Sequence, residues 1–256
     1  MATTHPRKQD QDTSSTASAE EVERFTAMAD AWWDPHGKFR PLHQINPVRI
    51  GYIRDHAATH FGRAPLADIP LKGLKLLDIG CGGGLLCEPL ARLGADVTGI
   101  DAGDKNVVIA SLHAEQSGLD IDYRHILPEA LMDAGNDFDI VLNMEVIEHV
   151  ADVDAFLEAS SSLLKPGGIM FLSTVNRTLK ALALAKIGAE YILRWLPAGT
   201  HDWRKFVKPS ELAHGLRSHG VNITDLTGMV YSPFQDEWKI SNNNLDVNYL
   251  AVAVKP

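Results

Sequence analysis

Short apolar runs alternate with helical apolar spacing through most of the chain. Runs bounded by Gly, Pro or Asp predict buried strands, and the segments between them place apolar residues three or four positions apart, as helices do. The predicted strands are 74–79, 96–100, 121–124, 139–143 and 169–173, with a closing antiparallel pair at 221–229 and 247–254. The predicted helices among them are 85–93, 105–116, 153–164 and 210–219. This alternation predicts an α/β fold whose mostly parallel sheet has helices on both faces.

Helical patterns precede the first strand. Ser18 and Glu21 have the spacing of a capping box, and apolar residues at helical spacing follow them. Asn46 and Pro47 predict the start of a second helix, which continues to about residue 60. Residues 19–73 are therefore expected to form a helical cap within a single domain, 19–256.

The segment 175–208 interrupts the alternation. A connection of this length in a compact domain is usually functional. It carries seven basic and two acidic residues, a net charge of +5, in a chain whose net charge is −9. A helix over 178–196 would gather Lys180, Lys186 and Arg194 on one side and apolar residues on the other. It is either an ordinary surface helix or a lid that also lies on an anionic membrane surface.

Composition and charge narrow the classes of function. The acidic balance argues against a nucleic-acid substrate, because binding phosphates needs a basic surface. No apolar run reaches the roughly 18 residues that span a bilayer, and residues 1–18 are polar, with no secretory h-region, and are expected to be a disordered tail. Cys81 and Cys87 have neither disulfide nor zinc spacing, so we expect reduced thiols in a cytoplasmic protein.

A glycine-rich turn follows the first predicted strand. Gly80 makes the tight turn, and Gly82 and its neighbours let backbone N–H groups approach a ligand that a Cβ would keep away. The next predicted strand leads to Asp101, which can accept hydrogen bonds from two ribose hydroxyls. This arrangement predicts a nucleoside cofactor.

The residues around the turn distinguish between cofactors. The dinucleotide fingerprint G-x-G-x-x-G would need glycine at Leu85 or Cys87, depending on the register, so both registers fail. Asp78 precedes the turn, where a carboxylate would repel a pyrophosphate but suits a ligand with an ammonium and a sulfonium. We therefore expect S-adenosylmethionine, with an NAD site or a turn without ligand as the alternatives.

The segment after the fourth predicted strand is rich in ionisable residues. Glu145, Glu148 and His149 have i, i+3, i+4 spacing and would share a face on one helical turn. Two carboxylates and an imidazole can hold Mg²⁺, Mn²⁺ or Zn²⁺. Alternatively, one acid contacts substrate while the histidine packs locally.

Three further residues are candidates for the site. His43, between the N-terminal helices, and His201, after the insertion, are each a candidate general base or substrate contact. Arg49 can pair with the methionine carboxylate of the cofactor, or equally with a surface acid.

Several motifs resemble those of the ubiquinone biosynthesis O-methyltransferases. The two most specific are the Pro-Leu-His-Gln-Ile-Asn-Pro stretch at 41–47 and the Gly-Ala-Glu-Tyr-Ile-Leu-Arg stretch at 188–194. Gly-Thr-His-Asp at 199–202 agrees with them, whereas the glycine turn and Met-Glu-Val-Ile-Glu-His at 144–149 occur across many class I methyltransferases. The likeness extends from about residue 25 to 249.

This resemblance implies a class I methyltransferase fold, Rossmann-like, with seven strands and a helical insertion after the fifth. It implies O-methylation, with S-adenosylmethionine, of a polyprenyl-6-hydroxyphenol (a catechol) and of 3-demethylubiquinol. By motif, Arg49, Gly80, Asp101 and Met144 bind the cofactor, beside Asp78 and Gly82 as argued above. The metal would be held by Glu145, Glu148 and His149.

The expected chemistry is deprotonation of a phenol, whose pKa is near 10. A bound cation would lower the pKa of this phenol. A base among Glu145, His149, His43 and His201 would remove its proton. A polyprenyl tail needs an apolar route to the membrane, which gives 178–196 a role at its inner face, and other enzymes of the pathway are further candidate partners. The alternatives are a methyltransferase for another small molecule and a non-catalytic membrane adaptor that binds the cofactor.

Overall fold

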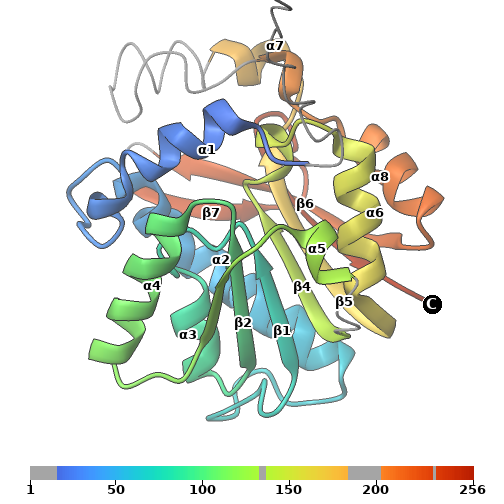
Figure 1. The fold of residues 1–256 in the computed structure, drawn as a ribbon. Coiled ribbons are helices and arrows are strands. Elements are labelled where there is room, and N and C mark those ends of the chain that lie inside the picture. The colour runs from blue at the N-terminus through green and yellow to red at the C-terminus, as the bar shows by residue number, and fades with distance from the viewer. Residues whose placement is uncertain (1–15, 133–136, 184–202, 233–234) are drawn as a thin grey trace, which may run out of the picture.

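A mixed sheet forms the centre of the protein (Figure 1). The computed structural model describes residues 16–132, 137–183, 203–232 and 235–256. Its eight strands have the order β3-β2-β1-β4-β5-β8-β6-β7. They are β1 (Lys75–Ile79), β2 (Asp96–Asp101), β3 (Asp122–His125), β4 (Phe138–Met144), β5 (Leu164–Val175), β6 (Asn222–Ser232), β7 (Glu237–Ser241) and β8 (Asn248–Val254). The first five are parallel, and β8 runs antiparallel to both β5 and β6.

The expected α/β class and the mostly parallel sheet are confirmed, but the count of seven strands is wrong for this chain. The additional strand is β7, which pairs antiparallel with β6 at the edge of the sheet. Its sequence, Glu-Trp-Lys-Ile-Ser, is mostly polar and exposed, so it lacks the apolar run that marked the buried strands. Charged side chains on an exposed edge strand keep it from pairing with a strand of another chain.

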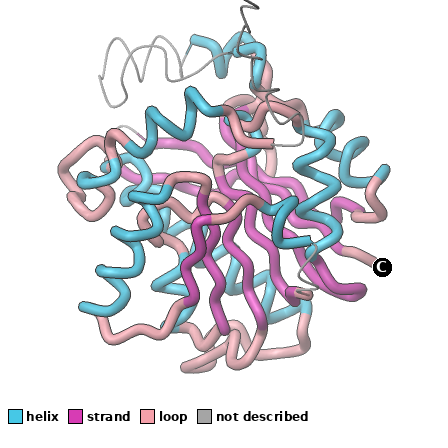
Figure 2. The backbone as a smooth tube through the Cα atoms, in the orientation of Figure 1, coloured by secondary structure: helices cyan, strands magenta, loops and turns pink. Residues whose placement is uncertain are grey.

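Helices cover both faces of the sheet; Figure 2 draws the helices cyan and the strands between them magenta. The helices are α1 (Ala19–Thr26), α2 (Arg40–His60), α3 (Cys87–Arg92), α4 (Asp104–Gln116), α5 (Pro128–Met132), α6 (Val153–Leu163), α7 (Leu179–Ala181) and α8 (Pro209–Ser218). α2 and α3 pack on one face, and α5, α6 and α8 pack on the other.

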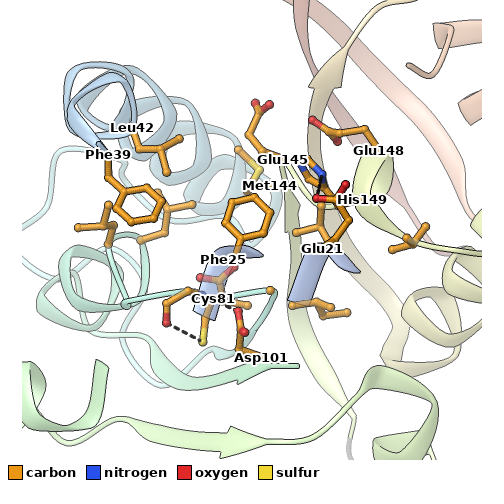
Figure 3. Close-up of a pocket in the computed structure, with 18 of the residues that line it drawn as sticks. Glu21, Phe25, Phe39, Leu42, Cys81, Asp101, Met144, Glu145, Glu148 and His149 are labelled. Atoms are coloured by element: carbon orange, nitrogen blue, oxygen red, sulfur yellow. Dashed lines mark hydrogen bonds and ion pairs between the residues drawn. The ribbon is translucent and has the colours of Figure 1, made fainter. Parts of the chain in front are cut away.

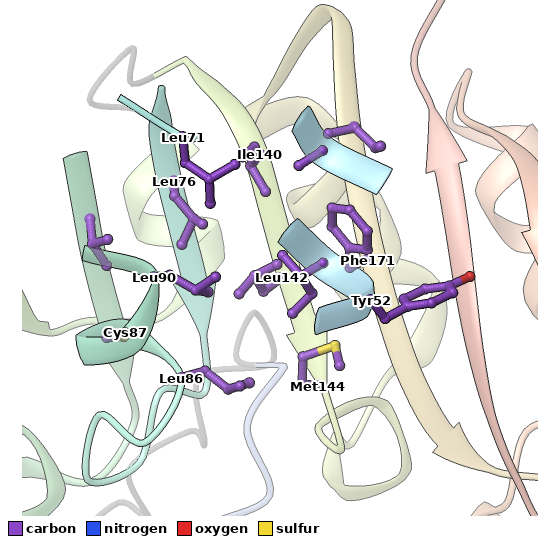
Figure 4. Close-up of a cluster of buried hydrophobic side chains, with 14 of the residues drawn as sticks. Tyr52, Leu71, Leu76, Leu86, Cys87, Leu90, Ile140, Leu142, Met144 and Phe171 are labelled. Carbon is purple, nitrogen blue, oxygen red and sulfur yellow. The ribbon is translucent and has the colours of Figure 1, made fainter. Parts of the chain in front are cut away.

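Two hydrophobic cores result, one on each face. Successive strand residues point to opposite faces, so Leu76 enters the core with α2 and α3 while Leu77 enters the core with α6 and α8. Tyr52, Phe171 and the leucines around them fill the first core (Figure 4). Burying each such side chain fully contributes roughly 1.5–3 kcal/mol, and this packing fixes the strand ends on which the site is built.

The helix expected to start at Asn46 begins earlier. α2 starts at Arg40 with Pro41 in its first turn, and Pro47 lies inside the helix. Pro41 is therefore the proline at the helix start, where its missing N–H has no cost. Asn46 does not cap; it is buried, and its Nδ2 donates to the Leu85 carbonyl 3.3 Å away. The packing of α2 outweighs the loss of one hydrogen bond at Pro47.

α1 lies across the carboxyl ends of the strands (Figure 1). Thr16–Ser18 directly precede α1 and belong to the described residues, although they were expected to be part of the disordered tail. Thr16 is 3% exposed, and its N and Oγ1 donate to the two carboxylate oxygens of Glu129 at 2.8 and 2.9 Å. Ala17 forms an antiparallel bridge with Val150. The expected capping box is absent, because the Ser18 side chain makes no cap hydrogen bond.

The described part of the insertion is short. α7 follows β5, and residues 184–202, which include most of the predicted 178–196 helix, lie outside the described residues. Among the helices that are described, none is long and apolar enough to cross a membrane.

Candidate functional site

A cavity of about 970 Å³ lies beyond the carboxyl ends of β1, β2 and β4 (Figure 3). Its volume is at the upper end of the range for small-molecule sites. Nine residues predicted from the sequence line it: Arg49, Asp78, Gly80, Gly82, Asp101, Met144, Glu145, Glu148 and His149. Of the two other candidates, His43 does not line the cavity and His201 lies outside the described residues.

The glycine turn after β1 has the left-handed backbone that glycine adopts without strain. Gly80 and Gly82 have φ of 74° and 54°, in the left-handed region. A Cβ on Gly80 would lie 2.6 Å from Val146, and one on Gly82 would lie 2.5 Å from Trp32. The N–H groups of Gly80 and Cys81 both donate to the Ile100 carbonyl, which ties the turn to the end of β2.

Asp101 ends β2, and its carboxylate accepts three hydrogen bonds, two from backbone N–H groups and one from a side-chain amide. Its Oδ2 accepts from Gly82 N at 2.9 Å, and its Oδ1 accepts from Gly103 N at 2.7 Å and Asn106 Nδ2 at 2.9 Å. Asn106 Oδ1 in turn accepts from the indole N–H of Trp32 at 2.9 Å. A carboxylate has about four acceptor positions, so Asp101 keeps capacity for a ligand hydroxyl while its orientation is fixed.

Asp78 is buried beneath the turn. It is 3% exposed, and Cys87 Sγ donates to its Oδ2 at 3.2 Å. Burial raises the pKa of Asp78 to about 7, with a further increase from the charge of Asp101; the Cys87 hydrogen bond and the nearby Arg49 act in the opposite direction. A buried carboxyl of this kind can be neutral or ionised near neutral pH, depending on the ligand beside it.

Arg49 projects from α2 into the cavity wall. Its guanidinium is buried, which lowers its pKa, although the carboxylates of Glu145, Glu148 and Asp78 oppose this effect. One terminal nitrogen lies 3.6 Å from Glu145 Oε1. Among the described residues, Arg49 Nε has no hydrogen-bond partner. A buried donor without a partner is costly, and the carboxylate of an amino-acid ligand is the kind of group that would satisfy it.

The turn after β4 is not the helical turn that the spacing predicted. Glu145 has φ of 59°, in the left-handed region, and Ile147–His149 form a 3₁₀ turn. Glu145 N donates to the Ser173 carbonyl, and Ser173 Oγ donates to Glu145 Oε1, both at 2.9 Å. A non-glycine residue held in this conformation is strained, and such strain is typical of functional sites.

Glu148 is buried close to Glu145. It is 4% exposed and accepts a hydrogen bond from Thr174 Oγ1 at 2.8 Å. Burial raises the pKa of Glu148 well above its usual value, and the negative charge of Glu145 raises it further. Burial and the neighbouring charge thus favour the protonated form of Glu148, whereas Glu145 faces Arg49.

The expected three-ligand metal site does not form in this arrangement. Glu145 turns to Ser173 and Arg49, Glu148 to Thr174, and His149 to Glu21. Within the described residues, no group of three His, Cys, Asp or Glu side chains is arranged to hold a metal ion. The described residues therefore do not fit a metal centre.

His149 contacts α1, and Figure 3 shows it beside Glu21. Its Nδ1 lies 3.2 Å from Glu21 Oε2, and the Phe25 ring contacts it edge-on with centroids 5.2 Å apart. Burial would raise the pKa of Glu21, but the adjacent imidazole of His149, with the charges of Arg24 and Lys205, lowers the pKa below its usual value. His43 is different: its Nε2 donates to the Trp32 carbonyl at 2.8 Å, which fixes the N-terminal cap.

Sequence reasoning missed two groups of residues that line the cavity. Glu21 and Phe25 were assigned to capping and packing within their own helix, and their contacts with His149 are long-range. The other group is an apolar wall of the cavity, formed by Leu42, Ile45, Met229, Tyr231 and Trp238. The apolar and aromatic alternation around residue 230 was the available signal for it.

Comparison with known proteins identifies close relatives. A family model described as a methyltransferase domain matches residues 52–226. The ubiquinone biosynthesis O-methyltransferase of Chelativorans sp. is 60% identical over 241 residues, covering 94% of this chain and 95% of the relative. The protein of the same name from Paramagnetospirillum magneticum is 59% identical over 240 residues, covering 94% and 96%.

Solved structures agree in fold. The magnesium protoporphyrin IX methyltransferase of Synechocystis, crystallised with bound SAM, superposes with a TM-score of 0.61 and covers 94% of this chain and 100% of its own. It is 18% identical in sequence, so the likeness shows the shared fold alone.

The pKa of Asp78 predicts a pH-dependent stability. In the unfolded chain an Asp has a pKa near 4, and in the fold Asp78 has a pKa of about 7. Between these values the unfolded state loses its proton first, so the free energy of unfolding should fall as pH rises from about 4 to 7, by up to about 4 kcal/mol. Asp78→Asn should lose this component, whereas Asn at the exposed Asp96 should not. Urea unfolding at a series of pH values measures it, and parallel profiles for wild type and Asp78→Asn would contradict it.

Proposed function

The chain belongs to the ubiquinone biosynthesis O-methyltransferases, and on that premise we propose that its cavity holds S-adenosylmethionine beside a polyprenylated catechol or quinol and methylates the ring hydroxyl. The observation that carries this proposal is the convergence of nine sequence-predicted residues on one cavity. The proposed acceptors are polyprenyl-6-hydroxyphenol and 3-demethylubiquinol.

The cofactor would occupy the side of the cavity formed by β1 and β2. Asp101 has acceptor capacity left for the ribose hydroxyls, and Arg49 has an unpaired N–H for the methionine carboxylate. Gly80 and Gly82 line this side of the cavity, and Met144 contributes an apolar contact. When bound, S-adenosylmethionine supplies an electrophilic methyl group on a sulfonium.

The acceptor would occupy the apolar side. Phe25, Leu42, Ile45, Met229 and Trp238 line that part of the cavity. A prenylated ring gains from burial against these side chains, because removing apolar surface from water contributes about 25 cal/mol per Å². Such a wall would give a charged, water-soluble acceptor no comparable gain.

His149 is the proposed general base. It lines the cavity, and because Nδ1 faces Glu21, Nε2 is the nitrogen left to take the proton of the ring hydroxyl. The resulting phenolate oxygen is the nucleophile for methyl transfer. Glu145, also on the cavity wall, is proposed to accept a hydrogen bond from the neighbouring ring hydroxyl, while Arg49 compensates its charge. Deprotonation by a positioned base contributes typically 10²–10⁴-fold to such a rate.

We further propose that the chain works at the inner, cytoplasmic face of a membrane. The support is the charge of +5 over 177–208 and the apolar residues interleaved with it. The described start of this segment adds support: Leu179 is 79% exposed, and Lys180 lines the cavity. A complex with other enzymes of the pathway stays a prediction.

Methyl transfer to a prenylated catechol tests the proposed function. The wild-type protein should methylate it with S-adenosylmethionine, and His149→Ala should lower kcat by about 10²–10⁴-fold because the base is lost. His214→Ala, on the exposed side of α8, should keep wild-type kcat. Binding of S-adenosylmethionine without turnover in the wild type would contradict the function, and full kcat in folded His149→Ala would contradict the role of His149.

Vesicle sedimentation tests the membrane proposal. Wild-type protein should sediment with phosphatidylglycerol vesicles, and less so at high salt, since polybasic binding is screened. Lys186→Glu with Arg194→Glu should lose this binding, whereas Arg217→Glu in α8 should retain it. Undiminished sedimentation of the double variant would place the membrane contact elsewhere.

A further inference from the structure

Glu21 is the one acidic residue of α1 that turns inward. Its side chain is 14% exposed, whereas Glu20 and Glu23 on the same helix are exposed. Because Ser18 makes no cap hydrogen bond, Glu21 does not complete a capping box. It serves contacts far along the chain instead.

The Glu21 carboxylate joins three separate segments. Oε2 lies 3.2 Å from His149 Nδ1, after β4, and 2.5 Å from an Arg24 nitrogen within α1. Oε1 lies 3.5 Å from Lys205 Nζ, in the segment that precedes α8. The carboxylate is thus held from several directions, and its position relative to the imidazole is defined.

The contact determines which nitrogen of His149 can act on a substrate. A carboxylate beside Nδ1 favours the tautomer with its proton on Nδ1, which leaves the Nε2 lone pair for the cavity. The edge-on Phe25 ring, also from α1, limits rotation of the imidazole. A base oriented by a third group in this way is a recurring arrangement for activating an oxygen nucleophile.

The same helix closes the cavity. Val22 and Phe25 of α1 line it, and the helix is fastened at its start by the Thr16–Glu129 hydrogen bonds and the Ala17–Val150 bridge. No residue of α1 itself is fully buried. Few buried contacts mean a low free energy of local opening, so α1 can move as a unit when ligands enter.

We propose that Glu21 is a positioning residue that orients His149, so that the catalytic site is complete only when α1 covers the cavity. This inference rests on the role of His149 proposed above. It couples closure to chemistry, because the helix that excludes water also carries the group that holds the base in its active tautomer.

Steady-state kinetics with the full chain and a prenylated catechol test the inference. Glu21→Ala should lower kcat by about 10- to 100-fold, the cost of a misplaced catalytic group, while KM for S-adenosylmethionine changes less than about threefold. Glu21→Gln keeps an oxygen that can accept from Nδ1 and should recover most of the lost kcat. Glu23→Gln is the matched control and should behave as wild type.

Combination with His149→Ala separates the two proposals. The double variant Glu21→Ala/His149→Ala should be no slower than His149→Ala alone, because Glu21 acts through the histidine. If His149→Ala is slow and folded Glu21→Ala has wild-type kcat, the positioning role of Glu21 is overturned, while the proposal that His149 is the base still stands. If His149→Ala itself is fast, the proposed base is wrong. If Glu21→Ala raises KM and leaves kcat unchanged, α1 only covers the cavity, and the proposal that Glu21 orients His149 is overturned.

A second readout does not depend on activity. In imidazole ¹⁵N spectra, the His149 signals are those that disappear in His149→Ala. They should show the Nδ1–H tautomer in the wild type and in Glu21→Gln. Folded Glu21→Ala should lose this tautomer. The same tautomer in all three proteins would overturn the inference.

Discussion

The fixed position of the Asp101 carboxylate is the constraint on which the site depends. It accepts hydrogen bonds from Gly82 N, Gly103 N and Asn106 Nδ2, and through Asn106 it reaches Trp32 in the N-terminal cap. Hydrogen bonds to a charged acceptor are about twice as strong as neutral ones. One side chain therefore joins the glycine turn, the start of α4 and the cap, and it still has capacity to bind a ligand.

The rest of the site follows from how buried charges are compensated. Arg49 lies among Glu145, Glu148 and Asp78, and the two most buried of these carboxyls, Asp78 and Glu148, have raised pKa values. Taking several ionised groups out of water together costs several kcal/mol each, and the raised pKa values favour the protonated forms of Asp78 and Glu148, while Glu145 lies opposite the arginine. The cavity consequently has one side rich in polar groups and one apolar side, as a methyl donor and a prenylated ring would need.

The sequence predicted what depends on local periodicity. The alternation of strands and helices, the glycine turn and Asp101 could all be recognised, because each is encoded by residues close together in the chain. β7 was missed because an exposed edge strand carries no apolar run, and the start of α2 was misplaced because Pro47 lies inside the helix. The helical spacing of Glu145, Glu148 and His149 misled, since the left-handed backbone at Glu145 prevents a helix there.

Long-range contacts account for the remaining difference. Glu21 matched a local capping pattern, and nothing in its neighbourhood of the sequence indicates that it lies beside His149, 128 positions later. The apolar wall of the cavity is assembled from α2, β6 and β7, which are distant in the chain and meet only because the fold brings them together.

Calorimetric titration with S-adenosylmethionine tests the central claim, that Asp101 organises the site and holds the cofactor. Asp101→Asn keeps the size of the side chain but loses its charge, and it should weaken binding by about 10- to 100-fold, the loss of one or two charge-assisted hydrogen bonds. Asp104→Asn, on an exposed neighbouring acid, should bind as the wild type does. Unchanged affinity in a folded Asp101→Asn variant would contradict the account.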